Sequence, residues 1–432
     1  MKNYKLAKLL LWPLLGLMAS AVQAQEAVQT TPVIRHFVFG ADRPGFTTVS
    51  ATTRYTAAHP FGYDFNTSSD GNGPFYFSVR ATEGNYRITA EVTATGADAV
   101  FTIKSESRRL AFLQNQLADG ATVKKTFIVN IKDRQIAGGG TVKLKSREYD
   151  KLDWDDKLTV EFNGERCALR SLTIEPVSNI PTVYLAGNST VVNQENEPWA
   201  SWGQMIPAFF TPDVAVANHA ESGLALGSFL GSKRLDKVLS VMKPGDYLFI
   251  EFGHNDQKEK GPQAGAWKSY TRRLIHFVKA VREKGGIPVI VTSTNRRRFD
   301  AEGHVENSLG DFPAAARKVA ADFNVPLIDL HRMTAVLYEA LGVEQSKKAF
   351  VHYPPSTYPG QREALKDNTH FNTYGAYQIA QCVLKGIREA LPELAQHIKP
   401  GAPTYDPAEP DAVASWNWPE SPRKDVTKPD GN

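Results

Sequence analysis

The fold of the second half of this 432-residue chain is decided by residues 182–191, which read TVYLAGNSTV. An apolar run, Thr182–Leu185, passes directly into a Gly-Asn-Ser-Thr loop. Four more apolar runs follow along the chain and are also predicted strands: Val214–Ala217, Tyr247–Phe252, Ile287–Val291 and Val325–Leu330. Helix-like stretches such as Tyr270–Lys284 and Phe312–Phe323 lie between them. Apolar strands separated by helices are typical of a parallel sheet that is covered on both faces. We therefore predict an α/β domain over residues 181–398.

Residues 33–178 carry a different pattern, in which apolar and polar side chains alternate over short runs. The stretch from Tyr86 to Val92 is one such run, and the turn-forming pair Gly84-Asn85 bounds it. Alternation with a period of two is typical of strands that bury one face. Several short strands of this kind predict an antiparallel β-sandwich or jelly roll ahead of the α/β domain.

The N-terminal segment has the three parts of a secretory signal peptide. Three lysines precede an apolar run over residues 9–19, and Val22-Gln23-Ala24 supplies small residues at the positions before a cleavage site. This arrangement predicts a signal peptide over residues 1–24. The apolar run is too short to span a bilayer, and no cysteine follows it for a lipid anchor. We therefore expect export to the periplasm or the medium, with no membrane anchor after cleavage.

The C-terminal segment, residues 399–432, is rich in Pro, Asp and Glu. Such a composition favours an extended or disordered chain, because too little apolar surface is available for a core of its own. Trp416 and Trp418 are the exceptions, and we expect them to pin part of this tail to the surface.

The composition excludes several classes of function. A net charge of +4, spread along the chain, is too small to indicate binding to nucleic acid or to a membrane surface. The two cysteines, Cys167 and Cys382, are expected to be buried free thiols, with a disulfide between the domains as the alternative. No cluster of cysteine or histidine has the spacing of metal ligands, so neither a metal nor an organic cofactor is implied.

Four short blocks of the α/β domain carry the candidate chemistry, and we expect each of them to fall just past a different strand, at one edge of the sheet. Ser189 lies in the loop after the first strand, where reactive groups collect in open parallel sheets. A serine needs a base to take its proton, and His370 is the best candidate. Asp367 lies three residues earlier, so one turn of chain would aim its carboxylate at the imidazole. These three residues form a predicted Ser-His-Asp triad.

The remaining blocks supply hydrogen-bond donors for an oxyanion. The backbone N–H of Ser189 is one candidate donor, and the side-chain amide of Asn255 is a second. Gly223 is the third, because a glycine lets its N–H approach a ligand closely. Each block has an ordinary alternative: Asn255 could belong to a turn, His254 to a supporting loop, and the Asp-His pair to a helix cap. Their occurrence together and in order favours the catalytic interpretation.

Taken together, these blocks resemble the SGNH (GDSL) hydrolases, whose four letters would fall on Ser189, Gly223, Asn255 and His370. The stretches Gly187–Val191, Pro198–Gly203, Asn218–Gly223 and Asp367–Asn372 look like those of the rhamnogalacturonan acetylesterases, carbohydrate esterase family 12. The resemblance covers roughly residues 180 to 395. It implies a flavodoxin-like three-layer fold and, for the preceding sandwich, a likeness to galactose-binding domains. The chain departs from the family at Asn188, where an aspartate is usual, which puts loop stability and pH behaviour in question.

If the substrate is an acetylated pectic polysaccharide, the enzyme must bind sugar faces and galacturonate carboxylates. Arg296, Arg297 and Arg298 follow the fourth strand and could bind a substrate carboxylate, with a solvated surface or salt bridges within the protein as the alternative. Trp199 and Trp202 could stack on sugar rings or pack in the core. His352, Tyr353 and Tyr358 are weaker candidates for a wall of the site.

The sequence leaves three hypotheses. The first is an exported serine esterase that removes acetyl groups from rhamnogalacturonan or a related pectin through an acetyl-enzyme. The second keeps this chemistry but changes the substrate to acetylated xylan, or to lipid or thioester acyl chains. The third is a carbohydrate-binding protein with a decayed hydrolase domain, which the intact Ser, Gly, Asn, Asp and His positions disfavour.

Overall fold

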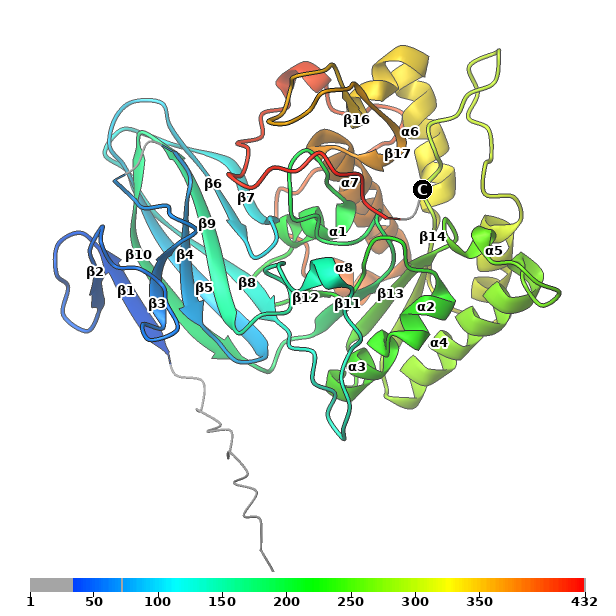
Figure 1. The fold of residues 1–432 in the computed structure, drawn as a ribbon, viewed down its shortest axis with the longest axis horizontal. Helices are drawn as coiled ribbons and strands as arrows, with labels where there is room; N and C mark the ends of the chain where they lie inside the picture. The colour runs from blue at the N-terminus through cyan, green and yellow to red at the C-terminus, as the bar shows by residue number, and fades with distance from the viewer. Residues whose placement is uncertain (1–33, 71–72, 431–432) are drawn as a thin grey trace, which may run out of the picture. The chain divides into compact units, whose positions relative to one another are not determined.

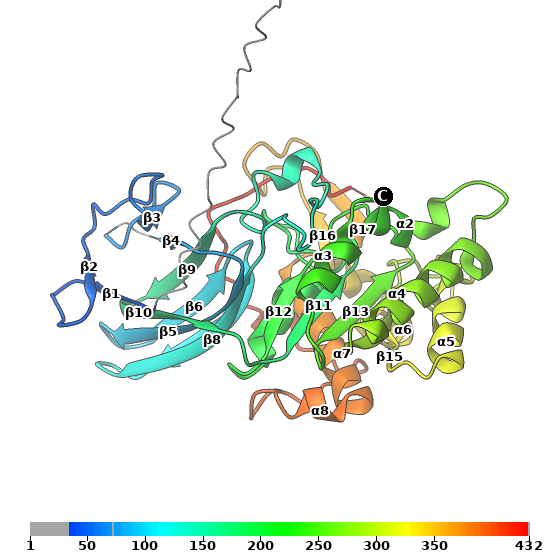
Figure 2. The same ribbon diagram turned by 90° about the horizontal axis from the view of Figure 1, so that it is seen from below.

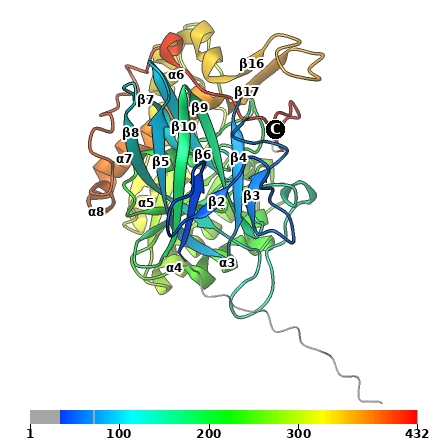
Figure 3. The same cartoon turned by 90° about the vertical axis from the view of Figure 1, so that its left-hand side faces the viewer.

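Ten strands in the first part of the chain form two stacked sheets (Figure 3). The computed structural model describes residues 34–70 and 73–430, so the signal peptide predicted over residues 1–24 lies outside the described residues. The strands are β1 (Arg35–Phe39), β2 (Thr47–Val49), β3 (Phe61–Asp64), β4 (Phe75–Arg80), β5 (Gly84–Ala94), β6 (Ala99–Ser105), β7 (Arg109–Leu117), β8 (Thr122–Ile131), β9 (Lys157–Glu165) and β10 (Cys167–Val177). One sheet has the order β2-β1-β10-β5-β8, and the other has the order β3-β4-β9-β6-β7. The predicted β-sandwich is therefore confirmed.

Strand β5 shows why this part of the sequence forms a sandwich. Ile88, Ala90 and Val92 are fully buried between the two sheets, whereas the residues between them are partly exposed. Neighbouring strands pair antiparallel, with the exception of β1 and β2. The alternation of side chains along each strand thus places one row in the core and the other row outside it.

Five parallel strands form the sheet of the second part, in the order β12-β11-β13-β14-β15. Figure 1 labels the first four, and Figure 2 labels β15. The strands are β11 (Thr182–Ala186), β12 (Ala215–Asn218), β13 (Tyr247–Phe252), β14 (Ile287–Thr292) and β15 (Leu327–Ile328). The first four match their predicted runs closely. The fifth is shorter than predicted because the Asp329 side chain accepts a hydrogen bond from the Arg332 N–H and starts a helix there.

Helices cover both faces of this sheet, as Figure 2 shows. They are α1 (Trp202–Met205), α2 (Leu226–Gly231), α3 (Arg234–Val241), α4 (Thr271–Glu283), α5 (Phe312–Asp322), α6 (Leu330–Gln345), α7 (Thr373–Ala390) and α8 (Pro392–Ala395). Tyr184 and Ala186 of β11 pack in one apolar cluster with α2, α3, α4 and α5. Val183 and Leu185 pack in another cluster with α1, α6 and α7. The three-layer α/β/α fold is therefore confirmed.

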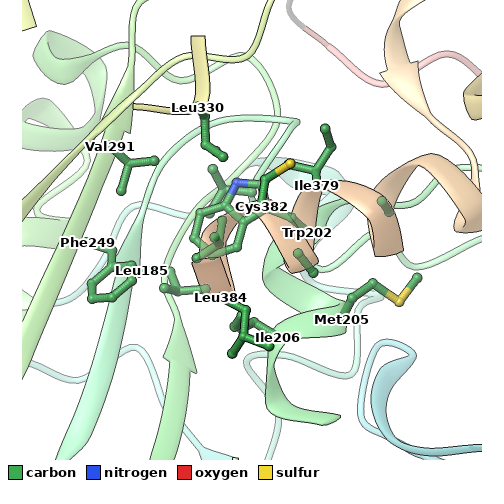
Figure 4. Packing of buried hydrophobic residues seen from close by; sticks show 14 of the residues in the cluster. Leu185, Trp202, Met205, Ile206, Phe249, Val291, Leu330, Ile379, Cys382 and Leu384 are labelled. Carbon is green, nitrogen blue, oxygen red and sulfur yellow. The ribbon is translucent and has the colours of Figure 1, made fainter. Parts of the chain in front are cut away.

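The second of these clusters centres on Trp202, which is fully buried (Figure 4). Its ring lies among side chains from the sheet and from α7, such as Leu185 and Ile379. The indole N–H donates a hydrogen bond to Glu251 Oε2 at 2.6 Å. A tryptophan held in this way fixes the segment that follows the Ser189 loop against the sheet.

A small two-stranded sheet precedes α7. Strands β16 (Phe350–Tyr353) and β17 (Leu365–Phe371) pair antiparallel. Helix α7 begins directly after β17, where the Asn372 side chain accepts a hydrogen bond from the Gly375 N–H. This cap anchors the end of β17, the strand that carries Asp367 and His370.

The segment 399–430 lies against both the sandwich and the α/β region without forming long elements. Trp416 Nε1 donates to Thr373 Oγ1, and Trp418 Nε1 donates to Glu197 Oε1. Lys104 of β6 donates to the Pro419 carbonyl, and the fully buried Ser421 bonds the Glu161 carboxylate. The expected pinning by the two tryptophans is present, and the alternative of a disordered tail is wrong for residues 399–430.

Two further expectations can be compared with the described residues. Cys167 and Cys382 are both free, and Cys382 is buried in the α7 cluster, so the disulfide alternative is wrong. Over residues 34–70 and 73–430, none of the helices combines the length and the apolar character that crossing a membrane requires.

Candidate active site

Three side chains from two distant segments meet beyond the carboxyl end of β11. Ser189 lies in the loop after β11, and Asp367 and His370 lie on β17. Ser189 Oγ is 2.9 Å from His370 Nε2, and His370 Nδ1 is 2.8 Å from Asp367 Oδ2. All three are buried, and the Ser189 residue is 5% exposed. The structure thus joins hydroxyl, imidazole and carboxylate in one chain of hydrogen bonds.

The Asp367 carboxylate is held by its own strand. Its Oδ1 accepts hydrogen bonds from the N–H groups of Thr369 and His370, at 2.8 and 2.9 Å. Burial opposes ionisation, but the hydrogen bonds from the His370 side chain and from these N–H groups outweigh it and hold the pKa of Asp367 well below its usual range. An ionised Asp367 fixes the imidazole proton on Nδ1 and leaves Nε2 free to accept the hydroxyl proton.

The loop that carries Ser189 rests on a buried carboxyl group. Thr190 Oγ1 lies 2.8 Å from Glu251 Oε1 and 3.0 Å from Asn188 Oδ1. Burial raises the pKa of Glu251 to about 7, against the opposing hydrogen bonds from Trp202 and Thr190. The Thr190 hydroxyl has a single proton, which it can donate to only one of these two acceptors at a time. Asn188 Oδ1 also accepts a hydrogen bond from the Thr190 N–H, at 3.1 Å.

Gly187 lets this loop turn tightly over the sheet. A Cβ at this position would lie 2.4 Å from the Val191 side chain and 3.2 Å from the Glu251 carbonyl. The Val191 and Val192 N–H groups both bond the Asn188 carbonyl. Only glycine fits this close approach, which sets the position of Ser189 between Gly187 and Val191.

The two other predicted oxyanion donors, Gly223 and Asn255, line one hollow. Gly223 has a φ of 80°, and Asn255 follows β13. Both line a hollow that is also bounded by Lys145 and Asp430. Asn255 Nδ2 donates to the Leu224 carbonyl at 3.1 Å, which orients the amide and uses one of its two hydrogens. The Leu224 carbonyl thus ties Asn255 to the Gly223 loop.

Both neighbours of Asn255 are buried, and one of them, Asp256, supports this loop. Asp256 is buried, its Oδ1 accepts from the Leu226 N–H at 2.9 Å, and burial raises its pKa to about 7. This bond holds the start of α2 close to the end of β13. Burial, together with the positive charge of Arg296, lowers the pKa of His254 well below its usual value, so this histidine is neutral.

The structure buries both tryptophans that were predicted to stack on sugar rings or to pack in the core. Trp202 is fully buried and bonds Glu251, so it cannot stack on a sugar. Trp199 is 4% exposed and packs edge-on against the His370 ring, with centroids 5.8 Å apart. Its Nε1 donates to the Asp425 carbonyl of the tail. For both residues the packing alternative describes the structure.

The three consecutive arginines separate. Arg297 is buried and bonds Ser346, Asn368 and the Val343 carbonyl, so it braces the α6 end. Arg298 is exposed and pairs with Glu306. Only Arg296 faces the site: its Nη2 lies 3.5 Å from the His254 carbonyl, and burial lowers its pKa while the Asp367 charge raises it. Arg297 is thus used within the fold and Arg298 is paired at the surface, and the carboxylate-binding role of this group stays a prediction.

Two of the weaker candidates, His352 and Tyr353, lie on β16, and the third, Tyr358, follows it and contacts the tail. His352 Nε2 is 2.9 Å from Asn368 Oδ1, and Tyr358 is buried with its hydroxyl 3.3 Å from Glu420 Oε1. Tyr353 packs edge-on against Tyr358. These contacts connect the β16–β17 loop to the tail.

Sequence reasoning missed a basic group that reaches this site from the sandwich region. Lys145, Arg147 and Lys151 lie in the connection between β8 and β9, around a 3₁₀ turn at Ser146–Glu148. They contact the segment Glu221–Gly223 of the α/β region. The sequence pattern around these residues does not reveal their contacts, because their partners lie more than 65 positions away in sequence. Within the described part of the chain, no group of three or more His, Cys, Asp or Glu residues could hold a metal ion.

Comparison with known proteins agrees with the geometry of the α/β region. A model of the GDSL-like lipase/acylhydrolase family matches residues 185–378. The chain is 42% identical over 218 residues to rhamnogalacturonan acetylesterase RhgT of Bacillus subtilis, covering 50% of this chain and 93% of that protein. It is 31% identical over 210 residues to the probable rhamnogalacturonan acetylesterase YesY of the same organism, covering 48% of this chain and 92% of YesY.

A third relative extends the match into the sandwich region. The uncharacterized esterase YxiM of Bacillus subtilis is 24% identical over 380 residues, covering 83% of this chain and 91% of YxiM. A match of that length exceeds the part of the chain after Pro181 and therefore includes sandwich strands.

Proposed function

We propose that this chain, which belongs to the GDSL-like lipase/acylhydrolase family and is a carboxylic ester hydrolase, acts on an acetylated pectic polysaccharide. In this proposal it removes acetyl groups from a substrate such as rhamnogalacturonan. The observation that carries the chemistry is the chain of hydrogen bonds from Ser189 through His370 to Asp367. The substrate class is supported by the identity to two rhamnogalacturonan acetylesterases.

The first half of the proposed reaction forms an acetyl-enzyme. Ser189 Oγ attacks the acetyl carbonyl carbon while His370 Nε2 takes the hydroxyl proton, and Asp367 stabilises the imidazolium. The negative charge on the carbonyl oxygen is stabilised by the N–H groups of Ser189 and Gly223 and by the Asn255 amide. As the C–O bond to the sugar breaks, His370 returns the proton to the departing sugar oxygen.

The second half releases acetate. Water loses a proton to His370 Nε2 and attacks the acetyl carbonyl, and the same donors stabilise the second oxyanion. The bond between Ser189 Oγ and the acetyl carbon then breaks, and Ser189 Oγ takes the proton back from His370. Acetate and the free serine result, so no cofactor takes part in these steps.

Export completes the proposal. A signal peptide over residues 1–24 would place the enzyme in the periplasm or the medium, where polysaccharides are met. The hydrogen-bonded triad disfavours a decayed hydrolase whose sandwich alone functions.

Acetate release from defined substrates tests this function. Acetylated rhamnogalacturonan oligosaccharides and acetylated xylan, matched in acetyl content, are treated with the wild type and with Ser189→Ala. We expect acetate from the pectic substrate, a much lower rate on xylan, and a loss of about 10⁶-fold in kcat in the variant. A faster rate on xylan would replace the pectic substrate, and an active Ser189→Ala enzyme would remove the proposed mechanism.

A further inference from the structure

The basic group of the sandwich region lies directly on the peptide that holds a proposed oxyanion donor. Lys145 Nζ donates to the Ser222 carbonyl at 2.6 Å, and Arg147 Nη2 lies 3.4 Å from the same oxygen. The N–H on the other side of that peptide belongs to Gly223. Two cations from outside the family domain therefore lie within one residue of the proposed oxyanion hole.

The local charges leave a surplus of positive charge. Arg147 and Lys151 each bond one oxygen of the buried Glu221 carboxylate, at 2.6 Å. Burial opposes ionisation of Glu221, but the charges of Lys151 and Arg147 lower its pKa to about 2, so it is ionised. Lys145 bonds a carbonyl oxygen of the α/β region, but it pairs with no carboxylate among the described residues of that region. Three cations thus face one buried carboxylate.

A second carboxylate of the same chain, that of Asp430, contacts two of these cations. Asp430 Oδ2 is 3.0 Å from Lys145 Nζ, and Asp430 Oδ1 is 3.3 Å from Arg147 Nη1. Its side chain is 53% exposed, so burial does not force it into this position. Asp430 also lies over Gly223: a Cβ built on that glycine would be 2.9 Å from Asp430 Cβ. A planar carboxylate therefore bridges two cations beside the proposed site of ester cleavage.

We infer that Lys145 and Arg147 form a subsite for a uronate carboxylate of the substrate, and that the Asp430 carboxylate occupies this subsite when no substrate is bound. The inference rests on the proposed function, since it assigns the sandwich region a role in choosing an acidic polysaccharide. A carboxylate bound by an ammonium and a guanidinium gains charge-assisted hydrogen bonds, which a neutral ester of the same sugar cannot match. The substrate displaces Asp430 without a change in net charge at the subsite.

The test compares two forms of one substrate. An acetylated rhamnogalacturonan oligosaccharide is used with free uronate carboxylates and, separately, with the same carboxyls as methyl esters, and 4-nitrophenyl acetate is a third substrate. The measured quantity is the ratio of kcat/KM for the free acid to kcat/KM for the methyl ester. We expect Lys145→Gln to lower this ratio about tenfold. Any effect on the oxyanion hole through Ser222 changes both values equally and leaves the ratio unchanged.

Two variants complete the design. Lys143→Gln removes the same charge from an exposed position two residues away in the same loop, and we expect the wild-type ratio. Asp430→Asn removes the competing carboxylate, and we expect kcat/KM for the free acid to rise severalfold while the methyl ester value is unchanged.

The outcomes separate this inference from the proposed function. An unchanged ratio in Lys145→Gln, in an enzyme active on both oligosaccharides, would overturn the subsite alone. An equal fall in Lys143→Gln would reduce the effect to long-range charge and would also overturn it. A wild type that cleaves 4-nitrophenyl acetate but neither oligosaccharide would overturn the proposed substrate and the subsite together.

Discussion

The two sides of the candidate site are built by different forces. On the side of the α/β region, Ser189, His370 and Asp367 are held by hydrogen bonds of 2.8 to 2.9 Å from elements of a packed three-layer fold. On the side of the sandwich region, ion pairs hold Lys145 and Arg147, and both side chains are partly exposed. Hydrogen bonds demand precise geometry, whereas charges act over longer distances. The difference suggests that reaction and choice of substrate are assigned to separate parts of the chain.

The same contrast holds beneath the surface. The α/β core around Trp202 is apolar, with Glu251 as its buried carboxyl partner. The contact between the sandwich and the α/β region instead contains buried ion pairs, such as Glu148 with Arg234 and Glu197 with Arg108. Apolar packing stabilises without a defined partner, whereas a buried charge depends on its counter-ion. Single substitutions should therefore have very different effects in the two regions.

The largest expected effect lies on the side of the α/β region. In Asp367→Asn the carboxylate that fixes the His370 tautomer is lost, and we expect kcat to fall about 10³- to 10⁴-fold. Hydrolysis of 4-nitrophenyl acetate measures this fall without involving the sandwich region. Asp322→Asn, at the exposed end of α5, is the matched control and should keep full activity. An Asp367→Asn enzyme within tenfold of the wild type would mean that Asp367 does not orient His370.

The next effect tests the ion pairs between the regions. Arg234 Nη2 lies 2.6 Å from both oxygens of Glu148, and both residues are buried. Arg234→Met leaves the Glu148 carboxylate buried without its cation, and we expect the free energy of unfolding to fall by about 3–5 kcal/mol. Urea unfolding measures this loss. Lys318→Met, which breaks an exposed pair with Asp322, should cost less than about 1 kcal/mol.

A double variant sharpens this comparison. Arg234→Met combined with Glu148→Leu removes both buried charges, so much of the lost stability should return. Equal losses in the single and double variants would show that packing of the arginine, rather than an uncompensated charge, causes the effect.

The sequence predicts much of the α/β region because its signals are local. The apolar runs at β11, β13 and β14 and the short blocks around Ser189, Asn255 and His370 each lie within a few consecutive residues. The parallel strands β11 and β13 are neighbours, so their carboxyl ends bring the Ser189 and Asn255 loops to one edge of the sheet. The His370 block instead reaches Ser189 from β17, a strand of the separate antiparallel sheet. Residue type alone did not indicate which way Trp199 and Trp202 point, and both proved to be buried.

The contribution of the sandwich region could not be predicted in this way. Lys145 and Asp430 are 285 positions apart, and an ion pair imposes no periodicity on either segment. The tail was expected to be extended or disordered from its composition, yet Ser421 is fully buried against Glu161. Contacts of this kind depend on the completed fold, so a single sequence carries no pattern for them.

The smallest expected effect concerns Glu251, the buried carboxyl group that bonds Thr190 of the serine loop. Glu251 has a pKa of about 7 in the folded protein against 4.5 ordinarily, because burial disfavours its charge. Between these pH values the folded state holds a proton that the unfolded chain has lost, so this group's contribution to stability falls as the pH rises. Glu251→Gln mimics the protonated form: its carbonyl accepts from Trp202 and its amide donates to Thr190.

We therefore expect wild type and Glu251→Gln to have similar stability near pH 4.5 and to diverge as the pH rises. From pH 4.5 to pH 7 the wild type should lose at most about 3 kcal/mol relative to the variant. Urea unfolding at several pH values measures this difference, with Glu389→Gln on the exposed side of α7 as the control. Asp256, whose pKa burial also raises to about 7, is present in both proteins and cancels in the comparison. Parallel stability profiles would mean that Glu251 is ionised in the folded protein, and the serine loop would then rest on a charge, as the sandwich side of the site does.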